Sequence, residues 1–194
     1  MFKETARTAF HDSDSLMLRN FSEEPIPVSM KGYHRDTVRH KDGRVEVFEG
    51  HNLVVTSFLN VVASFLKNKY PWAMYWAVGS GSSSWDSMAT LPTPLLADTA
   101  LVNEIGRMAV SDSEIVFLNG SYEESATPTN IIQITHLFGE SDCNGEWREF
   151  GLFSGNATAV SGSGIMINER RHRIITKTSD MTIERVMRFT LELS

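Results

Sequence analysis

The segment that most constrains the fold of this chain is residues 144–153 (NGEWREFGLF), in which an Asn-Gly turn dipeptide runs directly into apolar residues at both odd and even positions. Successive side chains of a β-strand point to opposite faces of its sheet. Phe150 and Leu152 would therefore face one side and Trp147 the other, so both faces need cover. Gly151 leaves a gap that another backbone or a ring must fill. The segment predicts a central strand with packed layers on both sides.

Other apolar patterns indicate a mainly β fold with a minor helical part. Apolar and polar residues alternate over 131–138 and over 187–193, as on strands with one buried face. Residues 53–67 instead have apolar side chains three and four positions apart, which predicts one amphipathic helix packed on the sheet. The gaps between strands are turn-sized and lack crossover helices, so antiparallel pairing is expected. The predicted fold is an antiparallel β-sandwich with one helix and an extended N-terminal arm.

The chain is expected to have two parts. Residues 1–43 have weak periodicity and are predicted to form the extended arm, and residues 44–194 the β-sandwich domain. The arm still carries apolar side chains, which are costly to leave in water at about 25 cal/mol per Å² of exposed apolar surface. We expect them to be buried on a neighbouring subunit. The arm residues predicted to form this assembly interface are Phe10, Leu16, Leu18 and Phe21.

Composition restricts the classes of partner. The net charge of −6 disfavours a protein that coats nucleic acid, because phosphate binding requires an excess of Lys and Arg. No stretch is long and apolar enough to cross a bilayer, so membrane insertion is not expected. Cys143 is the single cysteine and cannot form an internal disulfide, which is compatible with assembly in a reducing cytoplasm.

No arrangement of residues predicts catalysis, a metal or a cofactor. The Gly- and Ser-rich stretch 79–84 lacks the lysine of a phosphate-binding loop, and its serines have no neighbouring base. His136 has no second histidine or carboxylate at metal-ligand spacing, which favours a core histidine with a hydrogen-bonded ring. We therefore expect a protein that is not an enzyme.

One basic cluster and one tryptophan remain as candidate contact residues. Arg170, Arg171 and Arg173 are predicted to form a solvated turn or an Arg-rich subunit interface, and nucleic-acid contact is the less favoured alternative, since no aromatic residues are interleaved for base stacking. Trp85 follows the Gly- and Ser-rich loop and is the candidate ligand-facing aromatic.

Four segments occur in order along the chain: Tyr75-Trp-Ala-Val-Gly-Ser-Gly81, then Asp98-Thr-Ala-Leu101 with Glu104 and Arg107, then residues 144–153, then Ile175-Thr-Lys-Thr-Ser-Asp-Met-Thr-Ile183. Together they resemble tail-fibre or collar-type proteins of tailed bacteriophages, in which A-V-G-T-G, D-T-A-L, R-E-x-G-L-F and I-x-K-T-x-x-x-x-L follow one another. Ser80 and Ile183 depart mildly from that pattern. The resemblance covers residues 50–193 and implies a structural virion protein with a β-sandwich-like domain and no catalytic residues.

The leading hypothesis is a non-enzymatic baseplate, tail-fibre or fibre-attachment protein. It would assemble with copies of itself and with other phage tail or baseplate proteins, bind no small-molecule substrate or cofactor, and end in the virion. One alternative is a carbohydrate- or receptor-binding module in which Trp72, Trp76 or Trp85 stacks on a sugar. A second alternative is a head decoration or neck protein, which differs only in its place in the particle.

Overall fold

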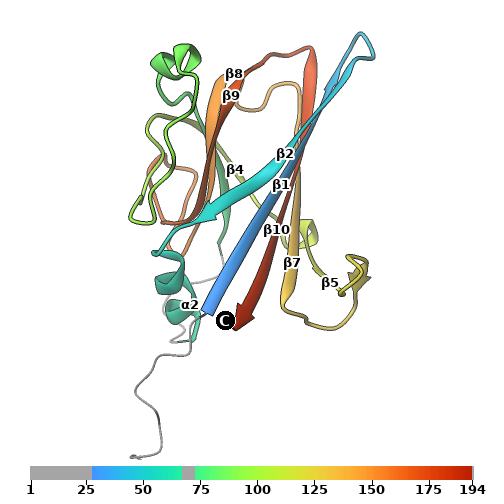
Figure 1. The fold of residues 1–194 in the computed structure, drawn as a ribbon. Coiled ribbons are helices and arrows are strands. Elements are labelled where there is room, and N and C mark those ends of the chain that lie inside the picture. The colour runs from blue at the N-terminus through green and yellow to red at the C-terminus, as the bar shows by residue number, and fades with distance from the viewer. Residues whose placement is uncertain (1–27, 67–72, 194) are drawn as a thin grey trace, which may run out of the picture. The chain divides into compact units, whose positions relative to one another are not determined.

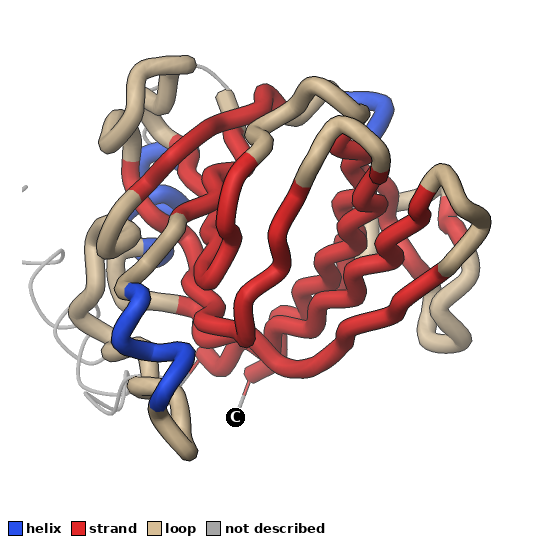
Figure 2. Tube along the Cα trace, turned by 90° about the horizontal axis from the view of Figure 1, so that it is seen from above, coloured by secondary structure: helices blue, strands red, loops and turns tan. Residues whose placement is uncertain are grey.

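The computed structural model describes residues 28–66 and 73–193, and Met30–Glu192 form one compact unit. Among the described residues, nearly all regular structure is strand, with one α-helix and two short 3-10 helices (Figures 1 and 2). The strands are β1 Val28–His40, β2 Val45–Val54, β3 Tyr75–Gly79, β4 Glu104–Ala109, β5 Ile115–Leu118, β6 Glu124–Ser125, β7 Ile131–Phe138, β8 Gly145–Ser154, β9 Ile165–Lys177 and β10 Met181–Leu193. The helices are α2 Phe58–Leu66, η1 Ser83–Ser87 and η2 Asp112–Glu114.

The strands form one sheet of ten in the order β4-β3-β8-β9-β2-β1-β10-β7-β5-β6. The registered pairs are antiparallel, as the short connections require. The prediction of a mainly β, antiparallel fold with one small helix is therefore confirmed. The sequence analysis expected a sandwich, and the structure has a single continuous sheet.

The sheet curves so strongly that strands far apart in its order share one core. Arg185 lies on β10 and Phe150 on β8, four places away, which at about 4.8 Å per strand would separate them by roughly 19 Å in a flat sheet. Yet the guanidinium carbon of Arg185 lies only 3.8 Å from the centroid of the Phe150 ring. Both halves of the sheet therefore contribute side chains to one main core.

β8 is the central strand that residues 144–153 predicted. It pairs with β3 on one side and β9 on the other, and the side chains of Trp147, Phe150 and Leu152 have no exposed surface. Gly151 also behaves as predicted, because a Cβ there would lie 2.6 Å from the carbonyl oxygen of Asn168 on β9. The predicted faces need one correction. Trp147 shares the main core with Phe150 and Leu152, because the β8–β9 register shifts between Trp147 and Glu149.

The second packed layer at β8 is a smaller apolar cluster. Phe153 packs there with Leu101, Ala157 and Met166, against the outer face of the strands. This cluster brings together the chain that precedes β4 and the connection between β8 and β9.

Two predicted boundaries are wrong. Val28–His40, placed by the sequence analysis in the arm, form β1, which pairs with β2 from Gly32↔Asn52 to Arg39↔Val45. The division predicted at residue 43 therefore falls inside a hairpin. The helix predicted over residues 53–67 begins only at Phe58, because residues 53 and 54 end β2 and pair with β9.

Candidate functional site

The candidate site is the outer face of β8 and β9, where charged side chains hold two loops against the sheet. The first loop, residues 80–103, joins β3 to β4 and contains η1 as its regular structure. The second, residues 155–164, joins β8 to β9. A loop has no neighbouring strand with which to form backbone hydrogen bonds, so its buried backbone groups need other partners. Here side chains of the strands supply these partners.

Glu149 ties the two ends of the first loop together. Its carboxylate has no exposed surface and accepts hydrogen bonds from three backbone amides, those of Asn103 (2.8 Å), Val102 (3.0 Å) and Gly81 (3.2 Å). Three N–H donors compensate a buried carboxylate for the water it has lost. The loop is thus closed on a single side chain of β8.

Arg148, the residue before Glu149, holds the middle of the same loop. It donates to both carboxylate oxygens of Asp86 at 2.9 and 2.6 Å and to the carbonyl oxygen of Ser80 at 3.2 Å. A further bond at 2.8 Å goes to Glu146. The hydrogen bond from Arg148 lowers the pKa of Asp86, and the arginine side chain is almost fully buried. This bidentate geometry fixes η1 on the strand.

Arg171 on β9 holds the far side of the loop. Its guanidinium donates to Glu169 at 2.7 Å and to Asp98 at 3.0 Å, and its central carbon lies 5.4 Å from the Trp85 ring centroid. Glu169 has no exposed surface, and burial raises its pKa to about 7 although Arg171 opposes the shift. The nearby Asp98 carboxylate raises that pKa further.

The predicted basic turn is a strand interior, so that prediction is wrong. Arg170, Arg171 and Arg173 lie within β9, where alternation sends them to different faces. Arg173 donates to the carbonyl oxygens of Trp85 (3.2 Å) and Ala89 (2.9 Å), whereas Arg170 donates to that of His51 at 2.5 Å. The three arginines hold other parts of the chain and do not form one free basic patch.

The Trp85 ring is also not placed as predicted. The residue is 5% exposed, because η1 turns the ring inward against Gly81 and beneath the Arg171 guanidinium. A ring buried in this way offers no face to a sugar. The arm residues Phe10, Leu16, Leu18 and Phe21 lie outside the described residues.

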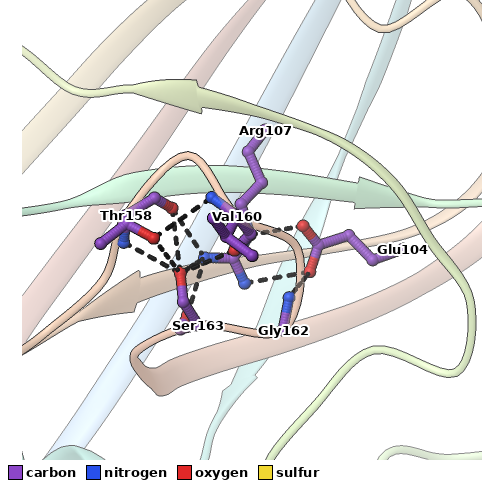
Figure 3. Close-up of polar contacts among 6 residues, drawn as sticks. All are labelled: Glu104, Arg107, Thr158, Val160, Gly162 and Ser163. Atoms are coloured by element: carbon purple, nitrogen blue, oxygen red, sulfur yellow. Dashed lines mark hydrogen bonds and ion pairs between the residues drawn. The ribbon is translucent and has the colours of Figure 1, made fainter.

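The second loop is held by a buried ion pair on β4, Glu104 with Arg107 (Figure 3). Arg107 donates to the carbonyl oxygens of Ser163 (2.7 Å) and Thr158 (3.3 Å), and Glu104 accepts from the amide of Gly162 at 3.1 Å. The other face of the guanidinium lies 4.4 Å from the Phe153 ring centroid. The pair therefore forms hydrogen bonds near the start of the loop, at Thr158, and near its end, at Gly162 and Ser163.

Ser163 closes the second loop on itself. Its hydroxyl accepts from the amide of Thr158 at 2.9 Å and donates to the carbonyl oxygen of Val160 at 2.7 Å (Figure 3). Val160 lies at the tip of this closed loop, with 69% of the residue exposed. These contacts of Ser163 lie within the loop, whose exposed residues include the polar Asn156 and Ser161 as well as the apolar Val160.

Lys177 performs a similar task for the turn that leads into β8. It is 1% exposed, and its ammonium donates to the carbonyl oxygen of Gly139 at 2.7 Å and to the side-chain oxygen of Asn144 at 3.0 Å. Burial lowers its pKa. An ammonium surrounded by oxygen acceptors fixes the path of the chain into the central strand.

The loops expose several apolar side chains among polar ones. Leu95, Leu96 and Val102 on the first loop are 62%, 60% and 57% exposed. The sequence analysis missed Glu149 and the Glu104–Arg107 pair as organising residues. The available signal was a charged dipeptide, Arg148-Glu149, inside an otherwise apolar strand. Held loops with apolar tips are suited to contact with another protein surface.

The remaining candidates for catalysis or metal binding have structural roles in the fold. His136 is buried, and its Nδ1 lies 2.5 Å from a Glu114 carboxylate oxygen, which confirms the predicted core histidine. In the described part of the chain, no three His, Cys, Asp or Glu side chains are grouped as a metal site would require. None of the described helices has the length and apolar character needed to span a membrane. Comparisons with protein-family models, curated proteins and solved structures found no match.

Proposed function

We propose that the chain is a structural component of a bacteriophage tail, in the baseplate, a tail fibre or the fibre-attachment region. It acts by assembly with copies of itself and with other tail proteins, without catalysis. In this proposal the two halves of the curved sheet serve as the two layers of a sandwich. A place in the head decoration or neck uses the same architecture and differs only in location.

The observation that carries this proposal is that the four segments that resemble phage tail proteins contact one another. Glu149 from the third segment binds the amide of Gly81 from the first, and Leu101 from the second packs against Phe153 of the third. Lys177 from the fourth holds the Asn144 turn that begins the third. The shared pattern therefore corresponds to one physical unit, the loops and the strands that hold them.

The surface of this unit favours assembly over catalysis. A catalytic cleft keeps polar groups available for substrate, whereas Arg148 and Glu149 of β8 and Arg171 and Arg173 of β9 are bound to the first loop. The exposed side chains of the loops include the apolar residues Leu95, Leu96, Val102 and Val160, beside polar ones such as Ser83, Thr99 and Ser161. Apolar side chains on rigid loops gain free energy when a partner covers them.

The carbohydrate-binding alternative has less support. Trp76 and Trp85, two of the rings that could stack on a sugar, are 0% and 5% exposed. Stacking requires an open ring face, so this function would need a different aromatic residue.

Location in a particle tests the proposal. Tailed particles from the phage that encodes the chain should contain it by mass spectrometry after density-gradient purification, and antibody-gold should label the tail. Labelling of the head or neck would instead support the alternative of a head decoration or neck protein. Absence from purified particles that retain their other tail proteins would overturn the proposal.

A further inference from the structure

The join between β2 and β9 is open over most of its length. These strands are neighbours in the sheet, but their register contains only Leu53↔Glu169 and Val54↔Asn168. Before this point β2 is registered with β1 alone, and beyond Glu169 β9 is registered with β8 alone. Figure 1 shows the two strands diverging toward the β1–β2 turn. A wedge-shaped opening with a strand edge on each side results.

The opening has a lining of apolar and polar side chains. A cavity of about 220 Å³ lies between the two edges; its apolar lining is Val38, Phe48, Ile174, Ile175 and Met181, and its polar lining is His40, Arg44, Glu46 and Thr176. Phe48 and Ile174 are 40% and 38% exposed, although both point toward a place that a closed sheet would fill. An edge with uncovered apolar side chains is a template for pairing with another extended segment.

We propose that this opening receives the N-terminal segment of a second copy of the chain, which adds as a strand between β2 and β9. This inference deepens the assembly function proposed above. Backbone groups on the two edges would bond to the added strand, and the cavity would take its inward side chains. The strand donated by the second copy would close the opening in the sheet of the chain that receives it.

The N-terminal segment has the length and composition that the opening requires. Twenty-seven residues precede β1, and they carry the apolar residues Phe10, Leu16, Leu18 and Phe21. Leu16 and Leu18 are two positions apart and would enter the cavity from one face of a strand. The run 15–21 contains no glycine or proline to interrupt pairing.

A second copy suits the opening better than the chain's own segment. β1 begins at Val28 and is 13 residues long, and the opening is widest near its other end, about 40 Å away at roughly 3.3 Å per residue. The chain's own segment would have to reverse at residue 28 and run back along all of β1. A neighbour's segment can enter without this reversal and joins two subunits as it does so.

Cross-linking between two different single-cysteine proteins tests the inference. In a Cys143→Ser background, one preparation carries Leu18→Cys and the other Phe48→Cys. After mixing and treatment with a short bis-maleimide, a band at twice the chain mass is expected. Val160→Cys in place of Phe48→Cys is the matched control, because Val160 is exposed on a different loop, and it should lose the band. Leu16→Cys and Phe21→Cys test neighbouring registers.

Three outcomes would overturn the inference. The first is no mixed dimer in any register although mass spectrometry shows that each cysteine reacts. The second is an equally strong band with the Val160 control. The third is seen with a further preparation that carries Leu18→Cys and Phe48→Cys in one chain: cross-linking only within that chain would assign the opening to the chain's own segment. Because the purified protein is used, a negative result here leaves the location of the chain in phage particles as a separate question.

Discussion

At the scale of single residues, the main core contains a buried charged pair, Asp36 and Arg185. Asp36 and Arg185 are 1% and 0% exposed and make two hydrogen bonds of 2.7 Å. Burial alone would raise the pKa of Asp36, but the charge and hydrogen bonds of Arg185 outweigh it and lower that pKa. The guanidinium also faces the Phe150 ring. The pair links β1 to β10 through the middle of the core.

Removing one partner of this pair should be strongly destabilising. Asp36→Ala leaves Arg185 buried without its anion, so we expect the free energy of unfolding to fall by about 3–5 kcal/mol. Lys31→Ala is the control, because the Lys31–Glu192 pair is exposed to solvent and should contribute little to stability. Urea denaturation measures both. A loss below about 1 kcal/mol for Asp36→Ala would show that the core accommodates an unpaired guanidinium.

Glu169 should give the protein a specific pH dependence. Its pKa is about 7 in the folded state and near 4.5 when exposed, so the folded state binds the proton more tightly. The stability that Glu169 contributes is complete below about pH 4.5 and is lost as the pH rises through 7. The total is roughly 3 kcal/mol at about 1.4 kcal/mol per pKa unit.

Glu169→Gln should remove this dependence, since the amide stays neutral at every pH. The difference in unfolding free energy between wild type and variant, measured by urea denaturation from pH 5 to 8, should change in favour of the variant as the pH rises. Buried His34 and His172, whose pKa values burial lowers to about 4, are present in both proteins and cancel in this difference. A constant difference across the range would refute the assigned role of Glu169.

At the scale of elements, the loop of residues 80–103 depends on one carboxylate of β8. Glu149→Gln keeps the size of the side chain but replaces its charge and one acceptor oxygen with an amide that cannot accept. We expect a loss of about 2–4 kcal/mol and faster hydrogen exchange at Gly81, Val102 and Asn103. Glu146→Gln is the matched control, because that side chain is more than half exposed. Unchanged exchange in Glu149→Gln would show that the loop is held by other contacts.

The element that the sequence analysis missed, β1, shows why pattern reading failed there. Its core-facing residues include Gly32, His34 and Asp36, which are buried but not apolar, so the alternation typical of a strand is absent. Asp36 pairs with Arg185, 149 positions away in the chain, and the His34 ring packs against Phe150, 116 positions away. Local patterns contain no information about such a distant partner. β8 could be predicted because it also buries the apolar residues Trp147, Phe150, Leu152 and Phe153.

The arginines of β9 that hold the first loop could not be identified from the sequence for a related reason. In the sequence, Arg171 and Arg173 are typical of a solvated segment, and only the fold places Asp98 and the carbonyl oxygens of the first loop opposite them. Trp85 was expected at the surface because of its Gly- and Ser-rich neighbours, yet a side chain from β9 covers it. Residues that contact distant strands can be identified as charged or aromatic from sequence, but their partners cannot.

At the scale of the whole molecule, the compact unit of residues 30–192 combines a curved sheet, two held loops and an open join between β2 and β9. The loops present apolar side chains, and the open join exposes strand edges. Both features lower their free energy when covered by protein. The architecture is consistent with a protein whose role is assembly, which is the central claim of this account.

Sedimentation velocity of the full chain over a range of concentrations tests this claim most directly. We predict species heavier than the 21.8 kDa monomer, growing with concentration. The double variant Leu95→Asp/Leu96→Asp should shift the distribution toward the monomer without changing its thermal unfolding, because both leucines are more than half exposed. A wild-type chain that sediments as a 21.8 kDa monomer at every concentration, with the variant indistinguishable from it, would contradict the account.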